Sequence, residues 1–254
     1  LVALGGLLLE RVKFVGILGM LHDEFFMKRM GGLEQQAAKS NKISPDGRTP
    51  AEELSACRFE IRDQMRLLSR LMNEEIRPAL AIAGIPILDY SELNEDQRTV
   101  IREDFAHEVV PILTPLAVDA THPFPFISGQ GLNMAIQVPD PAGRRERFVR
   151  LKIPTNRPRW VAVPDTRGFV PLEQVIAANL DLVLVGNESA RHYFFRVTRS
   201  AQVQVQEGNE AGEVDDSEES DSLLPGSIVR QVSRDLKARR FAGISRLKVG
   251  SDMP

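Results

Sequence analysis

The spacing of apolar residues changes character near the middle of the chain. Up to about residue 110, apolar residues recur every three or four positions, which predicts amphipathic helices. After about residue 130, apolar and polar residues alternate, which is typical of strands. We therefore predict an α+β chain. An all-helical N-terminal domain is expected at residues 1–110, and an α+β head domain with a mainly antiparallel sheet is expected at residues 111–254.

The segment Pro111–Phe126 lies where the two patterns meet. It contains four prolines, whose rings fix φ and remove backbone donors, so no helix is expected to run through it. We expect a shaped, extended connector. We place the junction between the two domains in this segment.

Two helices of the first domain are predicted from their ends. One covers Leu7–Met30 and is expected to stop at Gly31–Gly32, since glycine is common where helices end. Another begins at the capping box Asn94–Gln97 and must finish before Pro111.

A longer helix is predicted between these two. It begins at Thr49, where Pro50 at the first helical position and Glu52 complete a capping box. Pro78 is expected to bend or end it. Its apolar stripe is formed by Leu54, Cys57, Ile61, Met65, Leu68, Met72 and Ile76.

The second domain is predicted to contain strands and short helices. A hairpin of Leu132–Val138 and Phe148–Ile153 is expected to expose one face to water, with a turn over Asp140–Gly143. The other predicted elements are a strand at Trp160–Val163, a helix at Leu172–Leu180, a strand at Tyr193–Arg199, a helix carrying Val229, Val232 and Leu236, and a last strand at Ile244–Val249.

An acidic run separates the last two strands. Glu207–Asp221 contains eight acidic residues and no basic one, so it repels itself and has little apolar surface to bury. We expect a mobile loop over about residues 207–222. Because it would repel polyanions, any phosphate-binding surface is expected elsewhere.

Composition excludes several classes of protein. A formal net charge of −3 argues against nucleic-acid binding along the whole chain. The single cysteine, Cys57, excludes an internal disulfide and fits the cytoplasm. The apolar run Leu1–Leu9 is too short to span a bilayer, and no integral membrane segment is expected. No glycine-rich phosphate loop is present. Because the chain opens on leucine and lacks a closing element, we expect both ends to be cuts in a longer protein.

The four histidines do not suggest a metal site. None of them has a second His or Cys at metal-ligand spacing. His122 lies among prolines that could hold it rigidly as a base or nucleophile, but a junction residue bonded to a carbonyl is the simpler interpretation. His107 is expected to be exposed to solvent. The remaining two are His22 and His192.

Charged and aromatic candidates also have simple interpretations. Asp23 and Glu24 are adjacent on a helix and cannot form a shared acid–base site, so one is expected to cap the helix or pair with Arg29. Arg196 and Arg199 are expected on opposite faces of a strand, so at most one can join a phosphate-binding surface. Near a helix end, Lys237, Arg239 and Arg240 fit the helix dipole, and Phe124 and Phe126 are interpreted as wedges at the junction.

Four blocks of sequence nevertheless carry a resemblance. In order and spacing they resemble the bacterial polyphosphate kinase of the first type, and the third is the most specific. Weaker support comes from Trp160–Val161, Phe169–Glu173 and Arg246–Val249 followed by Met253–Pro254. The four blocks are Leu8–Phe14, Asp23–Met27, Ile112–Asp119 with His122–Ser128, and Phe195–Arg199.

The resemblance implies a helical domain and a head domain that precede two catalytic domains. That family transfers the terminal phosphate of ATP reversibly onto polyphosphate, through a phosphohistidine and with magnesium. Its catalytic histidines and its metal and phosphate ligands belong to the C-terminal half, so no catalytic or metal-binding residue is expected in this chain. The head implies a homodimer.

One nucleotide contact of the family is not matched. The family's helix usually carries an Asn near the adenine of ATP at the position of Leu21, and a leucine cannot make the hydrogen bonds of that amide. His22 is a weaker candidate for the same role. The usual Ser-Asn after Phe-Ile is also changed, to Ser128–Gly129.

We therefore predict the N-terminal and head region of an ATP:polyphosphate phosphotransferase, inactive by itself, that helps to wall the nucleotide site. The alternative is a stand-alone, non-catalytic interaction or regulatory paralogue, which Leu21 favours slightly. An unrelated helical adaptor would require the matching blocks to be coincidence.

Overall fold

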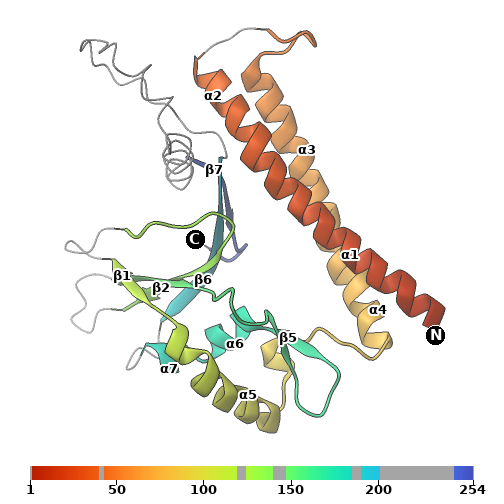
Figure 1. Cartoon of the computed structure of the whole chain (residues 1–254), viewed down its shortest axis with the longest axis vertical. Helices are drawn as coiled ribbons and strands as arrows, with labels where there is room; N and C mark the ends of the chain where they lie inside the picture. The colour runs from red at the N-terminus through yellow and green to blue at the C-terminus, as the bar shows by residue number, and fades with distance from the viewer. Residues whose placement is uncertain are drawn as a thin grey trace, which may run out of the picture.

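Two helical rods form the first part of the protein. The computed structural model describes residues 2–39, 43–118, 124–139, 147–184, 190–200 and 243–253. The first rod contains α1 (Val2–Phe25), the π-helical turn η1 (Phe26–Met30) and α2 (Gly31–Lys39). The second contains α3 (Pro50–Arg70), the π-helical turn η2 (Leu71–Ile76) and α4 (Arg77–Ile82). The rods lie side by side in Figure 1.

The predicted capping box at the start of α3 is confirmed. The Thr49 amide donates to Glu52 Oε2 at 2.8 Å, and the Glu52 amide donates to Thr49 Oγ1 at 3.3 Å. The Thr49 hydroxyl also donates to Glu52 Oε2, and the two bonds that the carboxylate accepts from Thr49 lower its pKa. Pro78 does not end the rod. A π-helical turn immediately precedes the α4 segment that contains it, which relieves the clash of the proline ring with the preceding turn.

The predicted stop at Gly31–Gly32 is wrong, because the rod continues through both glycines. Gly31 has helical angles, with φ −59° and ψ −38°. A Cβ at this position would lie 2.3 Å from Ser200 Oγ. Gly31 is therefore required for close approach of the rod to the end of a strand, and not for a helix end.

An antiparallel sheet organises the second part. It has the order β1-β3-β2-β6-β7 and contains β1 (Leu116–Val118), β2 (Leu132–Val138), β3 (Arg147–Lys152), β6 (Arg191–Arg199) and β7 (Ile244–Val249). A separate two-stranded sheet pairs β4 (Trp160–Ala162) with β5 (Phe169–Pro171). The predicted α+β class and the antiparallel strands are confirmed.

Helices cover one face of the main sheet. They are α5 (Glu95–Glu108), α6 (Leu172–Ala178) and the short α7 (Leu180–Val183), with 3₁₀ turns η3 (Tyr90–Glu92) and η4 (Val110–Ile112) at either end of α5. Ile101 and Phe105 of α5 are buried in the same cluster as Met134 and Ile136 of β2 and Val175 of α6. The main core therefore includes a helix that precedes residue 110.

The hairpin of β2 and β3 does not have one wet face, contrary to the prediction. Ala135 packs on the opposite face with Ile127, Phe195 and Val197. Asn133 is fully buried and accepts a hydrogen bond of 2.9 Å from Arg150 Nε. Apolar packing and a satisfied polar pair therefore cover the face that alternation assigned to water.

None of the described helices combines the length and the apolar character that a membrane crossing requires. The predicted acidic loop, the helix with Val229 and the turn over Asp140–Gly143 lie outside the described residues, as do Lys237, Arg239 and Arg240.

Candidate functional site

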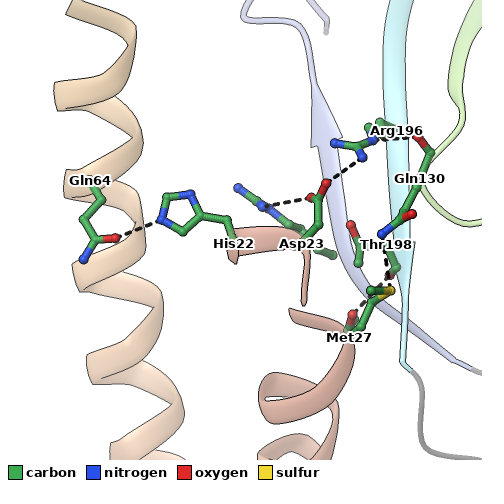
Figure 2. Close-up of polar contacts among 9 residues, drawn as sticks. His22, Asp23, Met27, Gln64, Gln130, Arg196 and Thr198 are labelled. Carbon is green, nitrogen blue, oxygen red and sulfur yellow. Dashed lines mark hydrogen bonds and ion pairs between the residues drawn. The ribbon is translucent and has the colours of Figure 1, made fainter. Parts of the chain in front are cut away.

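The end of α1 contacts both the second rod and the sheet. Its last turn carries two consecutive buried polar residues, His22 and Asp23, with 5% and 6% exposure. Figure 2 shows His22 directed toward α3 and Asp23 directed toward the strand that carries Arg196. Neighbouring positions of a helix point about 100° apart, so two consecutive side chains can contact different elements.

Asp23 connects the rod to two strands. Arg196 Nη2 donates to Asp23 Oδ2 at 2.6 Å, and Arg246 Nη1 lies 4.0 Å from Asp23 Oδ1. The Asp23 and Arg246 side chains are only 9% and 12% exposed. Burial lowers the pKa of Arg246, and the charge of Asp23 opposes this shift. The carboxylate thus compensates cationic groups that enter from β6 and β7.

Two further contacts hold these guanidinium groups in place. Arg196 Nε donates to the backbone oxygen of Gln130 at 2.8 Å (Figure 2). The guanidinium carbon of Arg246 lies 4.3 Å from the centre of the Phe26 ring, in cation–π contact. Both arginines are therefore fixed by a second group besides the carboxylate.

His22 is fixed by the second rod. Its Nε2 lies 2.8 Å from Gln64 Oε1, and Gln64 Nε2 donates to Glu60 Oε1 at 2.9 Å. The bond to Glu60 orients the Gln64 amide with its oxygen toward the ring, so His22 Nε2 is the donor. The other ring nitrogen, Nδ1, is buried and has no hydrogen-bond partner in the described part of the chain.

The structure brings Leu21 and His22 to one hollow. It has a volume of about 480 Å³ and lies between α1 and α3. Leu21 is 55% exposed, whereas His22 is buried. The other lining residues are Leu18, Phe25, Ala56, Cys57, Glu60, Ile61 and Gln64. The hollow is mainly apolar and has a few polar groups, which is typical of small-molecule sites.

The neighbour of Asp23 has a local partner. Glu24 pairs with Lys28 one turn along the helix, and this contact lowers the pKa of the Glu24 carboxyl. Neither carboxylate pairs with Arg29, so that prediction is wrong. Asp23 instead pairs with Arg196 of the sheet. The spacing of residues within the helix could not predict this partner.

Within the described residues, no other histidine hydrogen-bonds to the end of α1. His107 is exposed, as predicted. His192 is half-buried beside Phe194, and burial lowers its pKa while Asp252 opposes the shift. His122 lies outside the described residues.

The two phenylalanines are exposed, although wedges were predicted. Phe124 is 58% exposed and stacks on Phe148, and Phe126 is 41% exposed with the Arg199 guanidinium 4.4 Å from its ring centre. Arg199 Nε donates to the Ile127 backbone oxygen, so Arg196 and Arg199 serve different contacts.

Three residues of the contact network around His22, Asp23 and Arg196 were not predicted from the sequence. Gln64, Gln130 and Arg246 come from elements far apart in the chain, and no local motif marks them as neighbours of α1. The only signal was that Arg246 belongs to one of the weaker matching blocks.

Two family descriptions match the chain in sequence order. Residues 6–88 match the polyphosphate kinase N-terminal domain, and residues 96–254 match the polyphosphate kinase middle domain. A solved structure with a similar fold is the crystal structure of polyphosphate kinase from Porphyromonas gingivalis. Its TM-score is 0.71 at 21% identity, over 96% of this chain and 31% of that one.

Curated relatives agree with these matches. Polyphosphate kinase from Thermosynechococcus vestitus is 36% identical over 256 residues, which is 97% of this chain and 33% of that protein. Polyphosphate kinase 1 from Chlorobaculum tepidum is 33% identical over 257 residues, with 97% and 35% coverage. The chain thus spans about a third of the length of the curated relatives it matches.

Proposed function

The chain belongs to the polyphosphate kinase family, and from this premise we propose that it is the N-terminal and head region of an ATP:polyphosphate phosphotransferase. Such an enzyme moves the terminal phosphate of ATP reversibly onto inorganic polyphosphate. The proposal is carried by the order of the two family matches, N-terminal domain before middle domain. Because the chain spans about a third of its relatives' length, we assign the phosphohistidine chemistry to the remainder of such an enzyme.

The described residues offer no site for magnesium. In the described part of the chain, no three His, Cys, Asp or Glu side chains lie together in a group that could hold a metal ion. We propose that the metal is bound elsewhere in the parent enzyme, and we assign it no role in this chain.

We propose that the hollow beside Leu21 forms part of the wall of the ATP site. Apolar side chains from both rods suit the flat face of a base, and Glu60 and Gln64 add polar groups to the lining. Leu21 contributes surface but no hydrogen bond. We therefore expect this chain to bind ATP weakly.

The substitution Leu21→Asn tests this proposal. It restores an amide that can donate to and accept from the edge of a base, and one such net hydrogen bond corresponds to about tenfold in affinity. We expect about tenfold tighter ATP binding by calorimetry. Leu9→Asn is the matched control, because Leu9 is 54% exposed on the same helix and does not line the hollow. Equal affinities for both variants and the unchanged chain would exclude the hollow as the base site.

A second candidate is a non-catalytic interaction module, and Leu21 in place of an adenine-contacting amide is the observation that favours it. We further propose a cytoplasmic homodimer that forms through the head domain. Sedimentation in the presence and absence of ATP separates the two candidates. A dimer that binds no ATP, even with Leu21→Asn, favours the module.

The division at residue 110 stays a prediction. We propose that the unit that folds around the sheet begins nearer Asn94, because the buried face of α5 belongs to the core of the sheet.

A further inference from the structure

A second hollow lies on the sheet beyond Arg196. Its volume is about 570 Å³, which is in the range of roughly 300–1,000 Å³ that small-ligand sites occupy. Among the described residues, its lining includes four cationic side chains and no carboxylate. We call it the cationic hollow and define it by Arg157, Arg159, Arg196 and Lys248.

Lys248 has an unbalanced charge in this hollow. It lies directly opposite Arg196 in the pairing of β6 with β7, so both side chains are on the same face of the sheet. Within the described ranges, Lys248 has no hydrogen bond or ion pair. Burial and the nearby charges of Arg246 and Arg196 lower the pKa of Lys248, and only Asp23 opposes them. A half-buried ammonium group without a partner favours a bound anion.

Each of the three arginines forms an ion pair with a carboxylate from another element. A guanidinium has five N–H donors, so a carboxylate that binds one edge leaves donors for a ligand. The pairs are Arg157 with Glu108 at 2.7 Å, Arg159 with Glu173 at 2.5 Å, and Arg196 with Asp23 at 2.6 Å. None of these carboxylates lines the hollow. The cations are thus held in place before any ligand arrives.

From this arrangement we propose that the cationic hollow binds a linear oligophosphate chain. Arg157 and Arg159 come from the segment after β3, whereas Arg196 and Lys248 come from β6 and β7. A ligand with charge on several consecutive units can contact both groups, while a single phosphate can satisfy only part of them. This inference rests on the proposed function, since an oligophosphate occurs in that reaction as inorganic polyphosphate and as the tail of ATP.

Consecutive residues connect the two hollows. His22 lines the apolar hollow, and Asp23 holds Arg196 at the edge of the cationic one. Figure 2 shows Arg196 between Asp23 and Gln130. Gln130 also lines the cationic hollow. The end of α1 therefore positions groups of both hollows at once.

Calorimetry with the full chain at low salt tests the proposal, with tripolyphosphate, ATP, orthophosphate and a single-stranded oligonucleotide as probes. We expect tripolyphosphate to bind most tightly, and Lys248→Met to weaken it about tenfold. Lys248→Arg should retain the affinity within about twofold. Lys39→Met is the control, since Lys39 is an exposed lysine on α2 and does not line the hollow. Arg157→Gln provides an independent variant on the other wall, with a several-fold loss expected.

The outcomes distinguish inorganic polyphosphate from the phosphate tail of ATP as the ligand of the hollow. Loss of tripolyphosphate binding alone in Lys248→Met assigns the hollow to inorganic chains, and equal loss of ATP binding assigns it to the nucleotide tail as well. No tripolyphosphate binding, insensitivity to both variants, equal affinity for orthophosphate or tighter oligonucleotide binding would overturn the proposal.

Thermal unfolding provides a check on folding. Lys248→Met should unfold at the same temperature as the unchanged chain or higher, because it removes an uncompensated charge. The proposed function is tested independently by ATP binding of Leu21→Asn, so failure of one result does not imply failure of the other.

Discussion

Replacing Asp23 with asparagine is expected to lower the free energy of unfolding by about 3 kcal/mol. The substitution keeps the shape but leaves the guanidinium groups of Arg196 and Arg246 without a counter-charge, and breaking a buried pair from one side costs about 3–5 kcal/mol. We expect the lower end because the Arg196 side chain is 28% exposed. Urea unfolding of the chain measures the difference.

The neighbouring carboxylate is the matched control for Asp23→Asn. Glu24 has the same charge and an ion pair with Lys28, but both side chains are more than half exposed. Glu24→Gln is expected to leave the urea midpoint unchanged. The double variant Asp23→Leu with Arg196→Met should recover part of the loss, since apolar replacement of a buried pair is often neutral. If Asp23→Asn and Glu24→Gln behave alike, Asp23 does not hold the rod to the sheet.

Replacing Gly31 with alanine is the second large expected effect, a loss of about 1–3 kcal/mol. Alanine is favoured over glycine within a helix by roughly 0.5–1 kcal/mol, so the sign depends on the contact with Ser200. The added Cβ would lie 2.3 Å from Ser200 Oγ and 2.8 Å from Ser200 Cβ, closer than unstrained packing allows. The rod and the end of β6 must therefore separate.

Two other variants isolate this contact. Gly16→Ala lies in α1, and a Cβ there would meet nothing within 4 Å, so this variant should be stabilising. Ser200→Gly should remove most of the penalty when combined with Gly31→Ala. Urea unfolding of the unchanged chain, Gly31→Ala, Ser200→Gly and the double variant forms a double-mutant cycle. Additive effects of the two substitutions would show that the rod does not contact Ser200 in solution.

Local rules predicted much of the fold. The capping boxes of α3 and α5 depend on residues three positions apart, so the sequence shows both partners together. Alternation located β2, β3 and β6, because successive side chains of a strand point to opposite faces of the sheet. The expectation that glycine marks a helix end was wrong at Gly31. Glycine is needed there because the helix packs closely against Ser200 at the end of β6, far along the chain.

The sites were less predictable than the fold. The resemblance indicated Leu21 and His22, and the structure places both at one hollow. The cationic hollow was not predicted. Its side chains come from separate segments, and the net charge of −3 does not reveal that four of the positive groups line one hollow. A charge cluster of this kind is visible only once strand pairing is known.

The most direct test of the account is a phosphotransfer assay with the purified 254-residue chain. The chain is incubated with ATP labelled on its terminal phosphate, magnesium and a polyphosphate primer, and a full-length relative serves as the positive control. We predict neither labelled polymer nor labelled protein from the chain, although it is folded and binds tripolyphosphate. Labelled polyphosphate, or a phosphohistidine on this chain, would contradict the claim that it supplies binding surfaces and not the chemistry.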